Sequence, residues 1–269
     1  MTGEQVYEKR IKIFLSDPQV LFREGIHFIL SGEDDFEVIG ETTNNEEAFA
    51  LILGNPPNIA ILSMLNGKYN GPAITRRIKR SLPSVSIILT MDKSEEEELF
   101  AAMKSGASAC LTKDANPEYL LDIIRVVAQG SHPLTEALLI PALASKVLTE
   151  FEDLAILNEQ LDNLLASLAP QEMEILKSIA AGNEIEQVAT KLDINEETIR
   201  RNLRLILNKL VANDQARSLI EAVQRSMPSI MRGGFKTGSP SEEYVTREEF
   251  TSFKDSLMER LKPHIGETV

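Results

Sequence analysis

The sequence predicts a five-stranded parallel α/β domain, followed by an all-α domain and a C-terminal tail helix. Up to about residue 130, five short apolar runs rich in β-branched residues alternate with five amphipathic stretches of helical period. Residues 130–133 (GSHP) end this alternation, and compact helical stretches fill 168–226. Because an alternation of this kind is typical of parallel sheets covered by helices on both faces, the first domain is assigned to that class.

The strands are expected at 11–15, 36–40, 58–62, 85–90 and 109–112, and the helices at 20–30, 46–53, 73–81, 95–105 and 117–129. In a parallel sheet, function lies beyond the carboxyl ends of the strands. The candidate side chains there are Asp17, Pro18, Ser63, Thr90 and Lys113.

Composition limits the classes of function. The chain has 269 residues, enough for two domains, and a net charge of −13, so any DNA binding must come from a local basic patch. No apolar run reaches the roughly 20 residues of a membrane span, the N-terminus does not resemble a signal peptide, and Cys110 is the only cysteine. These features predict a cytoplasmic protein, while three scattered His predict neither a metal site nor a cofactor.

A helical linker is expected at 131–167. It carries an apolar stripe at spacings of three and four residues, made of Leu154, Leu157, Leu161, Leu164 and Leu168. Such a stripe fits a helix that packs along a partner, and it fits equally a connector that packs on its own domains.

Residues 168–226 have helix-turn-helix spacing. A helix at 185–192 is followed by a turn at Asp193 and Ile194, and Asn195 is placed to cap a helix that runs to Leu210.

The C-terminal segment divides into a flexible linker and one helix. Residues 227–245 are rich in Gly, Ser and Pro, whereas 246–262 begin with a capping box of Thr246 and Glu249 and carry Phe and Leu on one face. We expect this tail helix to dock on its own chain, on a second copy or on a partner.

Two sequence stretches resemble the receivers of NarL/FixJ-family response regulators. Residues 21–26 (LFREGI) resemble the start of the first receiver helix, and 106–115 (GASACLTKDA) resemble the fifth strand and its lysine loop. The resemblance covers residues 10–130 and implies the flavodoxin-like fold of CheY. It also implies phosphoryl transfer from a phosphohistidine to an aspartate at the end of the third strand, with Mg²⁺ as the counterion.

Carried over by position, Lys113 matches the family lysine and Thr90 the family threonine. Asp17 is followed by Pro18 instead of a second acid, and Ser63 stands at the phosphate-accepting position. Because a serine hydroxyl is a weak nucleophile without a base, we predict that no phosphorelay switches this pocket. Lys113 then either pairs with Asp17 or binds an anion, and Thr90 is either a switch residue or a strand-end hydroxyl.

Residues 168–176 (LAPQEMEIL) and 194–203 (INEETIRRNL) resemble a LuxR-type DNA-binding domain. The resemblance implies a second turn at 211–215 and a fourth helix at 215–226. The family contact positions fall on Arg200, Arg201 and Arg204, with Lys209 on the same helix. Against strong DNA binding, 168–226 hold eight Lys and Arg against nine Asp and Glu. The basic residues are interpreted as a reading face, with a merely solvated face as the alternative.

The resulting prediction is an atypical, non-enzymatic, phosphorylation-independent transcriptional regulator that binds DNA and is controlled by dimerisation or protein partners. A homodimer is expected, with RNA polymerase or another regulator as further candidate partners, and no membrane. The rival prediction is a protein-interaction adaptor with a relic DNA-binding domain.

Overall fold

The computed structural model describes residues 10–64, 70–160 and 165–226. The predicted linker at 227–245 and tail helix at 246–262 lie outside these residues, as do Leu161 and Leu164 of the apolar stripe. The chain divides into two compact units, 1–215 and 216–269. Within the described ranges, no helix combines the length and the apolar character needed to cross a membrane.

The predicted parallel sheet is confirmed. Its strands are β1 (Ile11–Ser16), β2 (Phe36–Thr42), β3 (Ile59–Ser63), β4 (Ser86–Met91) and β5 (Ala109–Thr112). All pairings are parallel, and the strand order is β2-β1-β3-β4-β5. The order reverses at β1, so the carboxyl ends of β1 and β3 form the switch point where such sheets carry their sites. The edge of the sheet that holds these carboxyl ends is called the switch edge below.

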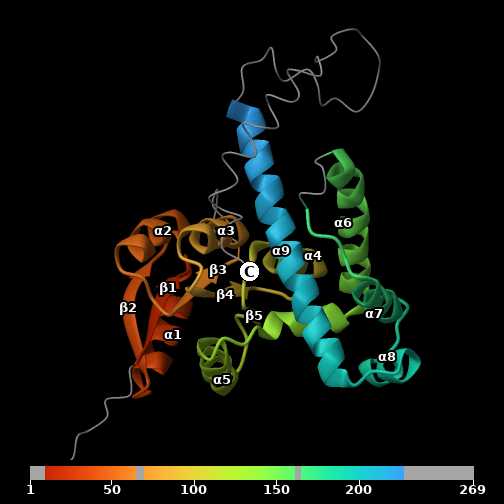
Figure 1. Ribbon diagram of the computed structural model, residues 1–269. Helices are drawn as coiled ribbons and strands as arrows, with labels where there is room; N and C mark the ends of the chain where they lie inside the picture. The colour runs from red at the N-terminus through yellow and green to blue at the C-terminus, as the bar shows by residue number, and fades with distance from the viewer. Residues whose placement is uncertain (1–9, 65–69, 161–164, 227–269) are drawn as a thin grey trace, which may run out of the picture. The chain divides into compact units, whose positions relative to one another are not determined.

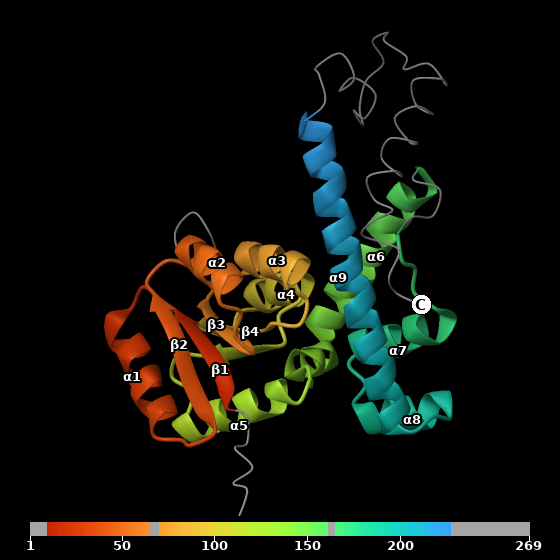
Figure 2. The same ribbon diagram turned by 60° about the vertical axis from the view of Figure 1, so that its left-hand side comes forward.

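Helices cover both faces of the sheet (Figures 1 and 2). They are α1 (Val20–Ser31), α2 (Asn45–Gly54), α3 (Gly71–Ser81), α4 (Glu96–Ser105) and α5 (Pro117–Ala128). One apolar core joins the sheet to α1 and α5, and the other joins it to α2, α3 and α4. The sheet and these five helices are called the α/β domain below.

Asparagines begin three of these helices. Asn44 caps α2, Asn70 caps α3 and Asn116 caps α5, each through a side-chain oxygen that accepts backbone N–H groups of the first turn. Each cap therefore fixes the residue at which its helix starts.

Beyond the α/β domain come η1 (Pro133–Leu139), α6 (Pro141–Gln160), α7 (Pro170–Ala180), α8 (Ile185–Leu192) and α9 (Glu196–Ser226). The core that covers α2, α3 and α4 extends into these helices through buried residues such as Leu138, Val147, Ile175 and Leu203. The part of this region from α7 to Gln215 is called the helical domain. It belongs to the same compact unit as the α/β domain.

The connector packs on its own chain where it is described. Leu154 of α6 is 5% exposed, and Phe151, which is 7% exposed, lies in the shared core. For Leu154, the first residue of the leucine stripe, this supports a connector that packs on its own domains. Most of the other leucines of the stripe are not among the described side chains.

One prediction is wrong. The turn expected at 211–215 is absent, and α9 continues as one helix to Ser226. No Gly or Pro lies between Glu196 and Ser226, so nothing in the chain stops the helix. Asn213 and Asp214, which are weak helix formers, are instead held by partners outside the helix: the Asn213 amide bonds the backbone of Ala166, and Asp214 pairs with Arg76.

A partly buried charge cluster joins the α/β domain to α9. Arg76 Nε of α3 lies 2.5 Å from Asp214 Oδ2, and Lys104 Nζ of α4 lies 3.9 Å from Asp214 Oδ1 and 2.5 Å from Glu150 Oε1 of α6. Beside this cluster, Gly106 has a φ of +85°, and a Cβ there would lie 3.2 Å from Val211 Cγ1. The end of α4 therefore meets α9 closely, at a position where glycine is favoured.

Candidate functional site

The switch edge of the sheet brings Asp17, Thr90 and Lys113 together. Asp17 is 4% exposed, and its Oδ2 lies 2.9 Å from Lys113 Nζ. Thr90 Oγ1 donates to the same oxygen at 3.4 Å, and the backbone N–H of Gln19 donates to Oδ1 at 2.8 Å. The buried carboxylate thus has an ammonium, a hydroxyl and an amide as donors, which is the partner set a buried charge requires.

Lys113 has further neighbours. Its Nζ lies 3.7 Å from the exposed carboxylate of Asp92 and 5.1 Å from the centre of the Phe22 ring. Only 12% of its side chain is exposed. The ammonium therefore lies between two carboxylates and over an aromatic face, so its charge is largely neutralised within the domain.

Ser63 ends β3 beside this group. It is 2% exposed and pairs in register with Thr90 on β4. Asn45 Nδ2 donates to its carbonyl at 2.9 Å, and Ser16 Oγ donates to Asn45 Oδ1 at 2.7 Å. Ser63 is therefore part of a buried hydrogen-bonded chain that links β1, α2 and β3.

Gly71 closes this side of the pocket. A Cβ at Gly71 would lie 2.7 Å from the carbonyl oxygen of Ser63 and 2.8 Å from Leu89 Cδ2. The start of α3 can approach β3 so closely only because residue 71 lacks a side chain. Pro18 differs from the other four predicted pocket residues, because it is exposed to solvent.

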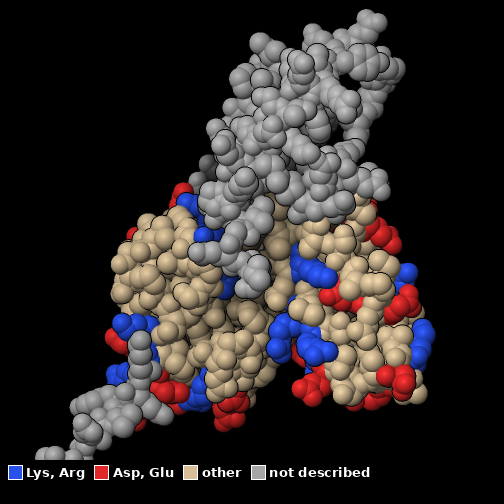
Figure 3. Space-filling model, viewed as in Figure 1, with Lys and Arg blue, Asp and Glu red and all other residues tan. Residues whose placement is uncertain are grey.

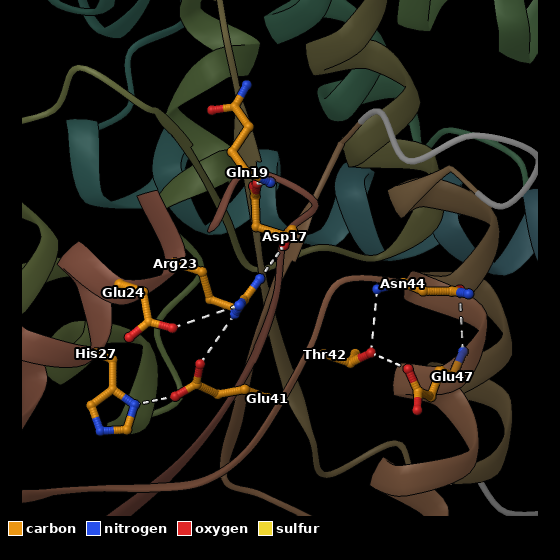
Figure 4. Close-up of polar contacts among 9 residues, drawn as sticks. All are labelled: Asp17, Gln19, Arg23, Glu24, His27, Glu41, Thr42, Asn44 and Glu47. Atoms are coloured by element: carbon orange, nitrogen blue, oxygen red, sulfur yellow. Dashed lines mark hydrogen bonds and ion pairs between the residues drawn. The ribbon is translucent and has the colours of Figure 1, made fainter. Parts of the chain in front are cut away.

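A polar network that the sequence did not predict lies next to the pocket (Figure 4). Arg23 of α1 donates to the carbonyl of Asp17 at 2.9 Å and forms an ion pair with Glu41 of β2 at 3.1 Å. Glu41 also contacts the imidazole of His27. Arg23 lies within the stretch that resembles receivers, but its partner Glu41 is 18 residues away on a strand, so no local pattern could have identified the pair.

The four predicted DNA-contact residues lie on α9, and Asn195 caps this helix as expected. Lys209 Nζ lies 2.7 Å from Glu172 Oε2, whose residue is 3% exposed, and 3.0 Å from the carbonyl of Ser167. Glu172 also accepts the N–H of Ala169, the residue before α7, which is the bond that the third helical residue makes in a capping box. Lys209 therefore ties α9 to the start of α7.

Arg200 also has acidic partners. Its Nη1 lies 2.5 Å from Glu136 Oε2 of η1, and the hydrogen bond and charge of Glu136 raise the pKa of the guanidinium further above its ordinary value. Arg201 and Arg204, in contrast, are exposed and have no acidic partner among the described residues. Figure 3 shows Lys and Arg side chains gathered over the region of η1 and the first turns of α9.

No group of three or more His, Cys, Asp or Glu side chains within the described ranges is placed to hold a metal ion. At the switch edge, Asp17 is accompanied by Pro18 and Ser63, neither of which supplies a carboxylate. The one buried carboxylate that a tightly held Mg²⁺ could use here, that of Asp17, already pairs with Lys113, and the other carboxylate near this lysine, Asp92, is exposed.

Comparison with known proteins gives the family. Residues 13–125 match the response regulator receiver domain, and 166–223 match the luxR family of bacterial regulatory proteins. The chain belongs to the LuxR-type response regulators. It is a transcriptional regulator with a receiver domain, here the α/β domain, and a DNA-binding helix-turn-helix domain.

Similar proteins match this chain over nearly their own full length. The transcriptional regulatory protein DegU of Brevibacillus brevis is 28% identical over 82% of this chain and 97% of its own. VraR of Staphylococcus aureus is 27% identical over 81% and 98%. The solved structure of the response regulator ChrA, from a heme-sensing two-component system, covers 78% of this chain and 97% of its own at 22% identity, with a TM-score of 0.41. DegU and VraR are named as a transcriptional regulatory protein and a response regulator, in agreement with the prediction of a regulator that is not an enzyme.

Proposed function

We propose that this response regulator controls transcription without being phosphorylated at its receiver pocket. The observation that carries the proposal is the Asp17–Lys113 ion pair beside Ser63. In a pocket that accepts a phosphoryl group, the lysine must be available to the incoming oxygens. Here the lysine, Lys113, pairs with Asp17, and Ser63 places a hydroxyl where the acceptor carboxylate would stand.

The chemistry of the pocket supports the same conclusion. A serine hydroxyl needs a base to become a nucleophile, and the carboxylate nearest to Lys113 already accepts three hydrogen bonds. The described residues thus provide the shape of a receiver pocket with its charges satisfied internally. We infer that the receiver is retained for contacts with other proteins or with a second copy, in the cytoplasm.

For the output domain, we propose that Arg201 and Arg204 make the first contacts with DNA. Both are exposed on α9, and arginine suits both phosphate oxygens and guanine edges. Arg200 would join them when it leaves Glu136, whereas Lys209 would stay with Glu172. A dimer would double the contacts and offset the near-neutral charge of the domain.

Two measurements test this proposal. Incubation with acetyl phosphate and Mg²⁺ is expected to leave the chain without a phosphoryl adduct by intact mass. DNA affinity measured against salt is expected to fall less steeply for Arg201→Ala/Arg204→Ala than for the wild type, by about one unit of log–log slope for each lost phosphate contact. Lys177→Ala, on the exposed face of α7, is the control for loss of a positive charge elsewhere in the domain.

A second candidate function is that of a protein-interaction adaptor. It is favoured by the acidic partners of Arg200 and Lys209, and by the exposed Leu21 and Phe28 of α1, which are 89% and 82% exposed. The partner would be a second copy, RNA polymerase or another regulator. Absence of salt-sensitive DNA binding by the wild type would favour this function over the first.

A further inference from the structure

Leu205 is an exposed apolar side chain on the helix that carries the arginines. It is 46% exposed, whereas Ile206 and Leu207, which follow it, are 0% and 4% exposed and lie in the core. Among the described side chains of α9, it is the only large apolar one classed as exposed. The helix therefore buries one apolar face in its own domain and presents a single leucine on the other.

The neighbours of Leu205 on this face are polar. The period of 3.6 residues places Leu205 one turn after Arg201 and one turn before Asn208, and Arg204 directly precedes it in the chain. All of these residues are exposed. Leu205 is thus surrounded by groups that form hydrogen bonds or carry charge, so nothing apolar within the described part of α9 covers it.

The four bases differ in what such a face can recognise. In the major groove, a guanidinium is well matched to the O6 and N7 atoms of guanine, whereas an aliphatic side chain forms no hydrogen bond and makes a favourable contact only with the C5 methyl group of thymine. In DNA, the group that a leucine beside two arginines can contact favourably is therefore the C5 methyl group of thymine.

We propose that Leu205 determines sequence specificity by contacting the C5 methyl group of a thymine close to a guanine that Arg201 or Arg204 contacts. This proposal rests on the proposed DNA-binding function and adds to it the base that is read. Four residues of helix span about 6 Å. Since successive base pairs are about 3.4 Å apart, the thymine is expected within about two base pairs of the guanine.

The alternative for Leu205 is that it contacts protein, either a second copy or a partner. The position of the side chain close to Arg201 and Arg204 favours DNA, because a protein surface that covered Leu205 would also have to neutralise both guanidinium groups. DNA supplies the apolar methyl group and the negative charge together.

The test removes a single methyl group from the DNA. Duplexes bound by the full-length protein are selected from a pool randomised over about two helical turns. Each thymine of a selected duplex is then replaced in turn by uracil, which lacks only the C5 methyl group. For the wild type, one such replacement per half-site is expected to weaken binding about four-fold, the effect of one buried methyl group.

Two variants make the result specific. Leu205→Asn is expected to bind the thymine and uracil duplexes equally, whereas Leu205→Met, which stays apolar, is expected to keep a preference for thymine. Because Leu205 is exposed, neither change should impair folding, and circular dichroism checks this.

The outcomes separate this inference from the proposed function. Salt-sensitive binding of selected duplexes with no effect of uracil at any position overturns the role of Leu205 and leaves DNA binding intact. A thymine preference that persists in Leu205→Asn also overturns it, as does a change of oligomeric state in that variant without a change in the thymine-to-uracil ratio. Failure of the wild type to bind any duplex overturns both proposals.

Discussion

The Asp17–Lys113 pair determines what the receiver pocket can do. Both side chains are nearly buried, at 5% and 12% exposure, and Asp17 also accepts hydrogen bonds from Thr90 and Gln19. Taking two charges out of water is costly, so each of them depends on the other for its stability in the folded state. The lysine therefore stabilises the pocket as it stands, and this pairing supports our proposal that the pocket binds no incoming phosphoryl group.

This dependence gives the first stability prediction. Lys113→Met leaves the Asp17 carboxylate buried without its cation and should lower the free energy of unfolding by about 3–5 kcal/mol in urea titration. The double variant Asp17→Asn/Lys113→Met removes both charges and should regain most of that loss. If the double variant were instead as unstable as the sum of the two single variants, the pair would not be coupled.

His132 gives a prediction about pH. Burial, followed by the nearby charges of Lys79 and Arg204, lowers the pKa of its imidazole below the ordinary 6.5. The unfolded chain therefore takes up a proton at a higher pH than the folded one. Stability should fall as the pH drops below about 6.5, until the lower pKa of the folded state is reached.

The check is thermal unfolding of the wild type and of His132→Gln between pH 7.5 and pH 5, a range that brackets the ordinary pKa of histidine. The variant should lose less stability than the wild type over this range. Parallel curves for the two proteins would assign the pH dependence to other groups.

The sequence predicted which residues meet at the switch edge, because the ends of parallel strands always share one edge. It left open whether Lys113 pairs with Asp17, since both interpretations use the same residues. The partners of Arg200 and Lys209 were not predicted, because Glu136 and Glu172 lie 64 and 37 residues away in sequence. Contacts of that kind depend on how the helices pack, which residue types alone do not reveal.

At the scale of elements, α9 is the main departure from the sequence prediction. The helix-turn-helix spacing, the Asn195 cap and the turn at Asp193 agree with it, and Asp193 has a φ of +54°, a conformation that aspartate tolerates. The expected break at 211–215 relied on the family pattern rather than on any helix-breaking residue. Without glycine or proline there, packing decides, and the helix continues.

The hydrogen bonds of Asn213 help to hold α9 in place where the turn was expected. It is 2% exposed, its Nδ2 donates to the Ala166 carbonyl at 2.9 Å, and its Oδ1 accepts the Ala166 N–H at 2.8 Å. Asn213→Ala should lower the free energy of unfolding by about 1–3 kcal/mol, because two backbone groups lose their partner. Asn208→Ala, on the exposed face of the same helix, is the matched control and should be neutral or slightly stabilising.

At the scale of the molecule, the receiver and the helical domain share one apolar core and the charge cluster of Arg76, Lys104, Glu150 and Asp214. We therefore expect them to unfold together in a single calorimetric transition. The sequence could not predict this contact, because Arg76 and Asp214 are 138 residues apart.

Asp214→Ala should weaken this coupling. The side chain is 9% exposed and is held by Arg76 and Lys104, so its loss should lower the free energy of unfolding by about 1.5–3 kcal/mol and broaden or split the transition. Glu174→Ala removes a solvent-exposed partner of Lys177 and should change stability by less than about 0.5 kcal/mol. Equal effects of the two substitutions would show that the cluster does not couple the domains.

The central claim is that the receiver pocket accepts no phosphoryl group and that output does not depend on one. Its most direct test is to measure the intact mass and the DNA affinity of the full-length protein in the same sample, before and after incubation with acetyl phosphate and Mg²⁺. The proposal predicts an unchanged mass and an unchanged affinity. A hydroxylamine-sensitive phosphoryl adduct at Asp17, together with a shift in DNA affinity, would contradict it.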